Sequence, residues 1–342
     1  MKQEPLISIV LLCYNYAHLL GRALEGIERQ TFRDFEVVFV NDGSTDNSLE
    51  VFKKFVEKHP EISCKIVSFS ENRGLANADN AGANAATGKY LMFHDADDWM
   101  DDNTLELLAS VALKSDPDRV VAMYRSVDDN NRVVHTQKMG NDPIQWRYTM
   151  QQANLFRNSI YKEHAIQLKD SLWVDAEKTL RFSRYAKKVE YIEKPCYNYL
   201  VHLDSTSKNK QIHQRMWTER YAWETLVKSV CDEYKGANEE EMKYLEYGLI
   251  FLYYSYMLQH LRNAPLKDKY NDAIKLQKVM KKYFPDYLSN KIVLTRLKVK
   301  GKETFRSKNI VKMMMFFEKH NLIKFAMWAY HIASKVFYFQ AC

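Results

Sequence analysis

Short, mostly apolar runs alternate with helical patterns over the first hundred residues. The apolar runs are rich in β-branched residues, as is typical of strands that are buried on both faces. The helical patterns carry their apolar side chains on one face. The expected strands are 7–12, 35–40, 65–69 and 90–93, and the expected helices are 18–30, 47–58 and 75–86. This alternation predicts βαβ units around a parallel sheet.

The pattern after residue 100 is less regular. We expect a strand at 119–126, a hairpin or loop to about residue 143, strands at 153–160 and 188–192, and a helix at about 175–185. From about residue 210 the pattern is helical almost to the end. The chain is therefore expected to have two parts, an α/β domain over residues 1–210 and a helical region over residues 211–342.

Charge is distributed unevenly along the chain. The net charge is +7, but residues 283–342 contain eleven Lys or Arg against three acidic residues, which is +8 for that stretch alone. A basic end fits nucleic acid or anionic lipid. Because this end has no recognised nucleic-acid motif and its aromatic residues run together like a packing face, no nucleic-acid partner is expected.

Cysteine usage and the N-terminus bear on the compartment. The five cysteines are odd in number, widely spaced and never form a CxxC pair, so neither a disulfide framework nor a zinc site is expected. The first residues carry no pattern of a signal peptide. The expected location is the cytoplasm, either free or peripheral on the inner face of the cell membrane.

Polar side chains gather where the expected strands end. Tyr14 and Asn15 follow the first strand, Asp42 follows the second, and an acidic cluster at 94–98 follows the fourth. Ligands of parallel α/β sheets bind at the carboxyl ends of the strands. The competing interpretation is that these positions are polar only because they lie in loops.

Asp95 and Asp97 give the sharpest chemical signal. In an extended segment, side chains two residues apart point the same way, so both carboxylates would reach one site. Mg²⁺ and Mn²⁺ prefer oxygen ligands, and a bound diphosphate would supply those that the protein does not. A solvated acidic loop before a helix is the competing interpretation.

Other polar residues have a functional and a structural interpretation each. Asp42 would either accept hydrogen bonds from a base or ribose, or stabilise a turn through hydrogen bonds to the backbone. Arg73 would meet phosphate or the acidic cluster, with Gly74 permitting a positive φ, or lie on the surface. Asp175 and Glu177 begin a helix, where a carboxylate often only complements the dipole.

The signatures of several enzyme classes are absent from the sequence. There is no GxxxxGK[ST] loop, no GxGxxG after a strand, no HExxH and no GxSxG. These absences disfavour P-loop kinases, common dehydrogenases, zinc proteases and α/β-hydrolases.

The motifs together resemble a family 2 glycosyltransferase of the GT-A fold, such as those that make bacterial exopolysaccharide, capsule or O-antigen. The matching segments are 8–15, 30–32, 40–46, 71–74, 80–82, 86–90 and 93–98, in the family's order and spacing. More loosely, 191–195, 197–199, His202 and 205–207 match the segment that follows the family's catalytic helix. The resemblance implies a mixed, mostly parallel sheet flanked by helices, with an α-helical C-terminal region.

The resemblance also implies roles for individual residues. Tyr14 and Asp42 would hold the base, Asp95 would contact the ribose or the metal, and Asp97 would ligate Mn²⁺ or Mg²⁺. His202 is a further candidate ligand near the diphosphate, or else a packed or surface histidine. The expected nucleotide-sugar-binding residues are Tyr14, Asn15, Asp42, Asn72, Arg73, Gly74, Asn80, Asp95 and Ala96.

Two positions depart from the family pattern. The family's Glu-Asp pair reads Val174-Asp175 here, which leaves Asp175 as the candidate base and Glu177 as its rival. Asp79 stands where an Arg commonly precedes Asn80, and no role is transferred to it.

The activity implied is inverting transfer of a hexose or N-acetylhexosamine from a nucleotide-diphosphate sugar, by default a UDP-sugar, to a glycan hydroxyl. The expected acceptor is a lipid-linked intermediate of surface polysaccharide synthesis. Transfer to a protein, small molecule or polyprenyl phosphate is one alternative, and a non-catalytic nucleotide- or nucleic-acid-binding protein is another.

Three apolar stretches in the helical region indicate which partners it could have. The uncharged stretch 247–261 is too short to span a bilayer and is expected to be a buried helix. The basic, aromatic stretches 313–317 and 325–339 would lie on an anionic membrane, pack on their own domain, or contact a second subunit of a homo-oligomer.

Overall fold

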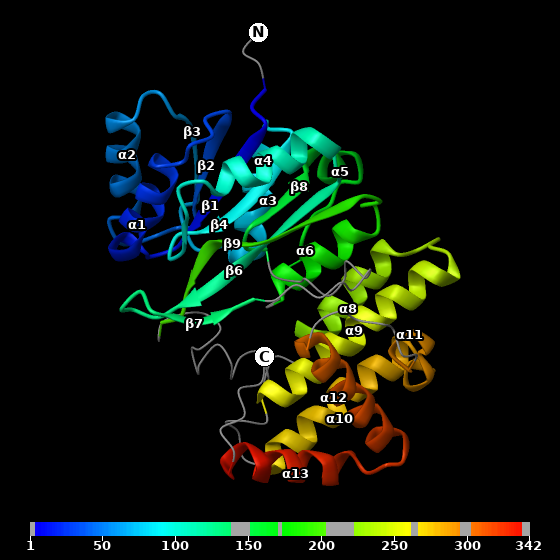
Figure 1. Ribbon diagram of the computed structural model, residues 1–342. Coiled ribbons are helices and arrows are strands. Elements are labelled where there is room, and N and C mark those ends of the chain that lie inside the picture. The colour runs from blue at the N-terminus through cyan, green and yellow to red at the C-terminus, as the bar shows by residue number, and fades with distance from the viewer. Residues whose placement is uncertain are drawn as a thin grey trace. The chain divides into compact units, whose positions relative to one another are not determined.

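The computed structural model describes residues 4–137, 151–169, 173–202, 222–260, 266–294 and 302–336 (Figure 1). One compact unit holds the described residues up to 202, and a second holds those from 222 onward. Each unit is described by itself.

The first unit is a layered α/β structure. Its strands are β1 (Ile7–Cys13), β2 (Phe35–Asn41), β3 (Ser63–Ser68), β4 (Tyr90–Asp95), β5 (Trp99–Met100), β6 (Arg119–Val127), β7 (Val133–Thr136), β8 (Asn154–Arg157) and β9 (Val189–Leu200). Its helices are α1 (Ala17–Glu28), α2 (Ser48–Lys58), α3 (Leu75–Ala85), α4 (Thr104–Ser115), α5 (Asn158–Glu163) and α6 (Val174–Ser183).

The described strands form one mixed, mostly parallel sheet in the order β3-β2-β1-β4-β8-β6-β9-β5, with β7 paired to β6. The strands β1 to β4 are mutually parallel, and β6 is parallel to β9. β8 runs antiparallel to both β4 and β6 and joins the two parallel groups. Neighbouring strands therefore reverse direction at β8.

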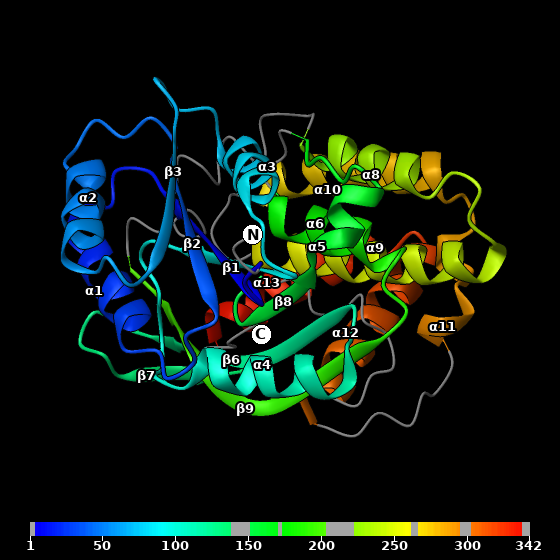
Figure 2. The same cartoon turned by 90° about the horizontal axis from the view of Figure 1, so that it is seen from above.

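Burial on both faces explains why β1 and β2 are mostly apolar; the polar exceptions inside them, Ser8 and Glu36, are hydrogen-bonded to each other (2.7 Å). In β1, Ile9 and Leu11 pack in one core with α1, α2 and α4, whereas Val10 and Leu12 pack in the other with α3, α5 and α6. Figure 2 shows α1 and α2 on the side of β1 and β2 opposite to α3. A side chain on either face of such a strand must be apolar.

The order of strands and helices over the first hundred residues is confirmed, and two later predictions need correction. The strand expected at 153–160 ends at Arg157, and α5 begins at Asn158, whose side-chain amide donates to the carbonyl of Gly88 (2.8 Å) and so turns the chain away from the sheet. The strand expected at 188–192 extends to Leu200, because its later residues continue to pair with β6 and β5.

The segment expected to be a hairpin or loop is a hairpin as far as the structure describes it. β7 pairs antiparallel with β6, from which it is separated by a short turn. Residues 138–143 of the expected segment lie outside the described residues.

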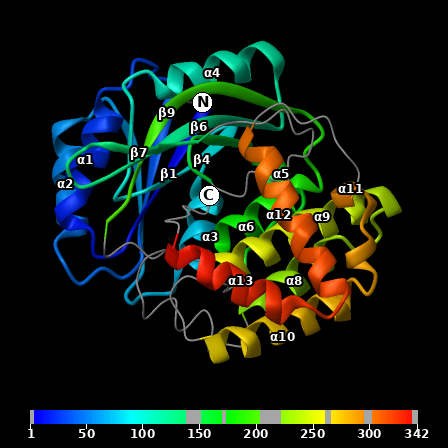
Figure 3. The same ribbon diagram turned by 60° about the horizontal axis from the view of Figure 1, so that its bottom comes forward.

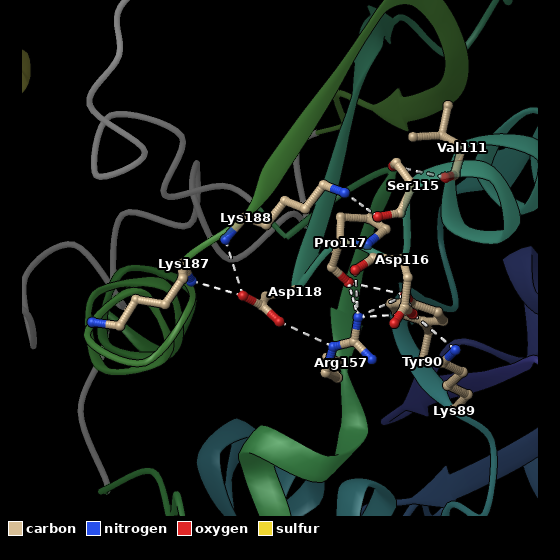
Figure 4. A network of polar contacts seen from close by, with 10 residues as sticks. All are labelled: Lys89, Tyr90, Val111, Ser115, Asp116, Pro117, Asp118, Arg157, Lys187 and Lys188. Carbon is tan, nitrogen blue, oxygen red and sulfur yellow. Dashed lines mark hydrogen bonds and ion pairs between the residues drawn. The ribbon is translucent and has the colours of Figure 1, made fainter.

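A polar network fastens three strands at the edge where β6 and β9 begin (Figure 4). Asp118, just before β6, accepts hydrogen bonds from the backbone N–H groups of Lys187 (2.7 Å) and Lys188 (2.9 Å), just before β9. It also accepts from Nε of Arg157 at the end of β8 (3.0 Å). One carboxylate therefore sets the relative position of β8, β6 and β9.

The second unit is helical (Figure 3). Its elements are α8 (Ala222–Glu233), α9 (Glu239–His260), α10 (Leu266–Tyr283), the 3₁₀ helix η2 (Tyr287–Ser289), α11 (Lys291–Leu294), α12 (Lys302–Lys319) and α13 (Ile323–Val336). The prediction of a buried helix at 247–261 is confirmed by α9 for the residues that the structure describes. Among the helices of the described residues, none has both the length and the apolar character needed to cross a membrane.

A buried carboxylate ties the helices of this unit together. Glu318 of α12 accepts hydrogen bonds from the hydroxyl groups of Tyr253 (3.2 Å) and Tyr254 (2.6 Å) of α9, and from that of Tyr287. The amide of Gln277 on α10 donates to the same side chain (2.8 Å). A buried carboxylate is tolerated when neighbouring groups satisfy its oxygens in this way.

We expect Asp118→Ala to lower the free energy of unfolding by about 2–3 kcal/mol, because two backbone donors and a guanidinium lose a charged acceptor. Urea unfolding followed by circular dichroism measures the change. Glu57→Ala, at an exposed position of α2, is the control and should stay within about 0.5 kcal/mol of the unmodified protein. An equal loss in both variants would show that the network does not join the strands.

Candidate active site

The register of the sheet brings three strand ends into line. Cys13 at the end of β1 lies opposite Asn41 at the end of β2, and Leu12 lies opposite Asp95 at the end of β4. The residues that follow these positions therefore share one edge of the sheet, as the sequence predicted for parallel strands.

Asp42 holds the loop that precedes α3. Its Oδ1 accepts a hydrogen bond from the backbone N–H of Arg73 (2.7 Å), and its Oδ2 accepts from the N–H of Gly74 (3.1 Å) and the amide of Asn72 (3.1 Å). Burial raises the pKa of Asp42, although these N–H groups act to lower it. The guanidinium of Arg73 lies over the ring of Phe69, 4.8 Å from its centroid.

Two glycines allow this loop to approach the end of β2. Gly74 has a φ of +84° at the start of α3. Gly43 has a φ of +69°, and a Cβ there would come within 2.1 Å of the backbone of Glu71. Only glycine satisfies both the space and the backbone angle at position 43.

Asn15 connects the ends of β1 and β2. Its side-chain oxygen accepts from the backbone N–H groups of Thr45 (2.8 Å) and Asp46 (3.3 Å), and its own N–H donates to Oγ of Ser44 (3.0 Å). Asn15 thus organises the loop, while the neighbouring Tyr14 exposes 44% of its surface at the same edge.

Asn80 and Ala96 also make backbone contacts. The amide of Asn80 donates to the carbonyl of Leu168 (3.0 Å), and its oxygen accepts from the Leu168 N–H (2.8 Å). Ala96 is buried, and its N–H donates to the carbonyl of Leu12 (3.0 Å). Both residues fix the backbone that surrounds the site.

The acidic cluster is not an extended segment, which corrects the geometric argument from the sequence. Residues 96 and 97 form a turn, closed by a hydrogen bond from the N–H of Asp98 to the carbonyl of Asp95 (3.1 Å). Burial raises the pKa of Asp95 to about 8, and the negative charge of the neighbouring Asp97 adds to the rise. The two acids meet through a turn rather than along a strand.

Asp97 and His202 form the contact best suited to a divalent metal. Oδ2 of Asp97 lies 3.0 Å from Nε2 of His202, and both side chains are largely buried. Carboxylate oxygen and imidazole nitrogen both suit Mn²⁺. Among the residues that the structure describes, no group of three or more His, Cys, Asp or Glu is arranged to hold a metal, so the remaining ligands would come from a bound diphosphate and water.

Asp95 is held from a segment that the sequence analysis missed. Its carboxylate accepts from the amides of Gln151 (3.2 Å) and Gln152 (3.1 Å), just before β8. Because β8 runs against its neighbours, its beginning lies where the parallel strands end. A search for site residues that is limited to the carboxyl ends of parallel strands does not find these two glutamines.

A buried lysine was also missed. Lys178 of α6 has no exposed surface, and its Nζ lies 2.7 Å from Oδ1 of Asp79 on α3 and 3.5 Å from the centroid of the Phe93 ring. The same amine donates to the side-chain oxygen of Gln151, whose amide contacts Asp95. The sequence did contain a signal for Lys178. It lies three residues after Asp175, and residues three apart share one side of a helix.

Asp175 lies in the first turn of α6 beside this chain of contacts. Its Oδ1 is buried and has no hydrogen-bond partner among the described residues. Burial raises the pKa of Asp175 to about 6, with Lys178 acting against the rise and Asp79 adding to it. The pKa of the Asp175 carboxyl group is therefore closer to neutral pH than the pKa of an exposed aspartate.

Glu177 has a different environment on the same helix. Its two oxygens accept from the backbone N–H of Lys169 at 3.1 and 3.2 Å, and Oε1 also accepts from Nη1 of Arg181 (3.3 Å). The side chain is fully buried and joins α6 to the segment after α5.

Residues 8–173 match the family model described as glycosyl transferase family 2, so the chain carries a domain of that family. The match includes the strand ends and the acidic cluster and stops just before Asp175. The chain is 28% identical over 243 residues to glycosyltransferase GlyA of Streptococcus pneumoniae serotype 4, which covers 65% of this chain and 33% of GlyA. It spans between 22% and 39% of the length of three of the curated relatives that it matches.

Solved structures show the fold. TarS 1–349 of S. aureus, in complex with UDP-GlcNAc, has a TM-score of 0.53 at 18% identity and covers 82% of this chain and 92% of its own. The mannosyltransferase PcManGT of Pyrobaculum calidifontis, in complex with GDP-Man and Mn²⁺, has a TM-score of 0.53 at 15% identity and covers 98% and 87%. The first unit thus has the GT-A fold that the sequence predicted.

We expect Lys178→Met to lower the free energy of unfolding by about 3–5 kcal/mol, because Asp79 would keep a buried charge without its partner. Urea unfolding at pH 7 measures the loss. The deficit should shrink as pH falls toward about 3.9, because an unpaired buried aspartate has a raised folded-state pKa and is stable when protonated. The double variant Asp79→Asn/Lys178→Met should recover at least half of the loss. Additive losses from the two substitutions would contradict the pairing.

Proposed function

We propose that the chain is a metal-dependent inverting glycosyltransferase that moves a sugar from a nucleotide-diphosphate sugar to a hydroxyl group of a glycan. The contact between Asp97 and His202, beside Asp95 at the edge of a family 2 domain, is the observation that carries the proposal. We assign catalysis to residues 1–210 and a role outside the chemistry to residues 211–342. The proposed acceptor is a lipid-linked intermediate of surface polysaccharide synthesis.

The donor is proposed to be a UDP-sugar bound along the edge of the sheet. The exposed ring of Tyr14 offers a stacking surface for the base, and Asp42 lies on the neighbouring strand. Asn15, Asn80 and Ala96 would support this surface through the backbone, and Asn72, Arg73 and Gly74 form the loop that Asp42 holds. That TarS binds UDP-GlcNAc and PcManGT binds GDP-Man supports a nucleotide sugar as the donor class.

The metal is proposed to be held by Asp97 and His202 together with the donor diphosphate, and Asp95 would contact the ribose or join these ligands once the donor is bound. Bound Mn²⁺ or Mg²⁺ would neutralise charge that develops on the departing diphosphate. The carboxylate and imidazole fit such an ion, and the presence of Mn²⁺ in PcManGT supports it. Gln151 and Gln152 would fix the orientation of Asp95.

Asp175 is proposed to be the base. As the acceptor oxygen bonds to the anomeric carbon, the bond between that carbon and the diphosphate oxygen breaks, and the acceptor proton passes to the Asp175 carboxylate. A single displacement inverts the configuration. An available oxygen and a raised pKa favour Asp175, whereas the oxygens of Glu177 are engaged by Lys169 and Arg181.

We expect Asp97→Ala to abolish metal-dependent turnover and His202→Ala to reduce it about 10–100-fold, since each removes a ligand of the metal. Release of nucleoside diphosphate from a panel of nucleotide sugars, with Mn²⁺, Mg²⁺ or EDTA, is the measurement. Glu57→Ala is the control. Turnover that is insensitive to EDTA, or retained in Asp97→Ala, would refute the metal site; no binding of any nucleotide sugar would refute the transferase.

We expect Asp175→Asn to lower kcat about 10²–10⁴-fold without weakening nucleotide binding, because only proton transfer is lost. In the unmodified protein kcat/KM should fall as pH drops below about 6, since a protonated base cannot accept a proton. Glu177→Gln should chiefly lower stability and keep this pH profile. A larger kcat loss in Glu177→Gln than in Asp175→Asn would reverse the assignment.

A further inference from the structure

The helices α12 and α13, drawn in orange and red in Figure 3, carry exposed apolar side chains. Among the described residues, fifteen large apolar side chains are exposed, and six of them fall between residues 313 and 332. These six, here called the α12–α13 apolar surface, are Met313, Phe316, Leu322, Phe325, Trp328 and Ile332. Met313 and Phe316 are three residues apart in α12, and Phe325, Trp328 and Ile332 are three and four apart in α13, so each set lies on one side of its helix; Leu322 comes just before α13.

Ring contacts make this surface continuous between the two helices. Phe316 and Phe317 of α12 have centroids 5.9 Å apart, and Phe317 lies 6.1 Å from Phe325 of α13. Phe325 in turn lies 6.0 Å from Trp328. Phe316, Phe325 and Trp328 expose 57%, 54% and 47% of their surface. Soluble monomers seldom leave such a contiguous apolar group in water without a purpose.

The same helices supply the core of their unit from other positions. Val311, Met314 and Met315 of α12 are buried, as are Ala326 and Met327 of α13. The exposed rows are therefore additional to what folding of the unit uses. They are available for a partner.

The chain segment that carries the α12–α13 apolar surface is positively charged. Residues 309–332 contain Lys312, Lys319 and Lys324 and a single acidic residue, Glu318. Glu318 is buried, with its carboxylate bound by tyrosine hydroxyls and Gln277, so it offers no negative charge at the surface. Lys319 and Lys324 are exposed at the end of α12 and the start of α13.

We propose that the α12–α13 apolar surface binds an anionic lipid bilayer, with the two helices lying in the plane of the interface. The apolar side chains would enter the boundary between headgroups and acyl chains, and each lysine near the surface would add electrostatic attraction to anionic lipid. Aromatic side chains, tryptophan above all, favour this boundary. The inference does not depend on the proposed chemistry of the first unit.

A second copy of the chain fits this surface less well. A two-fold interface brings the same patch against itself, so the lysines of one copy would approach those of the other. The patch has no exposed carboxylate of its own to balance them. A bilayer that contains anionic lipid supplies the missing negative charge.

Flotation of the full chain with vesicles tests the proposal. We expect binding to vesicles of phosphatidylcholine mixed with phosphatidylglycerol, binding at least tenfold weaker to phosphatidylcholine alone, and weakening by salt. Phe325→Ser/Trp328→Ser should reduce binding at least tenfold, and so should Lys319→Glu/Lys324→Glu at low salt. Leu113→Ser, at an exposed apolar position of the first unit, is the matched control and should bind like the unmodified chain.

Three outcomes would overturn the proposal: no binding to anionic vesicles, equal binding to both kinds of vesicle, or equal loss in the Leu113→Ser control. A dimer in sedimentation velocity that Phe325→Ser/Trp328→Ser converts to monomer, without any vesicle binding, would assign the surface to a second copy instead. Thermal unfolding of each variant shows that it is folded, and the charge-reversal variant leaves every apolar contact in place.

Discussion

Repulsion between carboxylates is the constraint around which the edge of the sheet is organised. Asp79, Asp95, Asp97 and Asp175 influence one another there, and burial removes the water that would otherwise screen them. Lys178 contacts Asp79 directly. It also donates to Gln151, whose amide contacts Asp95. Its amine also lies over the ring of Phe93, so its position is set by packing as well as by charge. The negative charge that remains is what would attract a divalent metal and favour a proton acceptor.

The helical unit solves the same physical problem in another way. Glu318 is buried like Asp79 of the first unit, but neutral hydroxyl and amide donors surround its oxygens. Such donors stabilise the group without adding an opposite charge. The first unit leaves Oδ1 of Asp175 without a hydrogen-bond partner among the described residues, while the second uses one carboxylate to hold helices together.

The parts that the sequence predicted well are those in which burial leaves one choice of residue type. Strands buried on both faces must be apolar, so β1, β2 and β4 and the alignment of their ends followed from the pattern. β8 did not, because it is only four residues long and turns directly into α5. The partnership of Asp97 with His202, far apart in the chain, came from resemblance and not from periodicity.

Site residues were harder to predict because one chemical group serves two purposes. The amides of Asn15 and Asn80 are predicted to contact the nucleotide, and the structure shows that they also hold loop backbone. The sequence does not distinguish an asparagine with the one role from an asparagine with the other. Lys178 was overlooked because a lysine in an amphipathic helix is usually solvated. Gln151 and Gln152 were overlooked because the direction of β8 is a property of the tertiary fold.

The role of Glu318 has a consequence for producing shortened forms of the protein. Ending the chain before α12 would remove the exposed apolar rows, an obvious way to improve handling in solution. It would also remove Glu318 and leave the hydroxyls of Tyr253, Tyr254 and Tyr287 and the amide of Gln277 without the acceptor around which they are gathered. The shortened protein would lose the packing of α9 and α10 together with the rows. Substitutions on the outer side of α12 and α13 separate these two effects, and deletion does not.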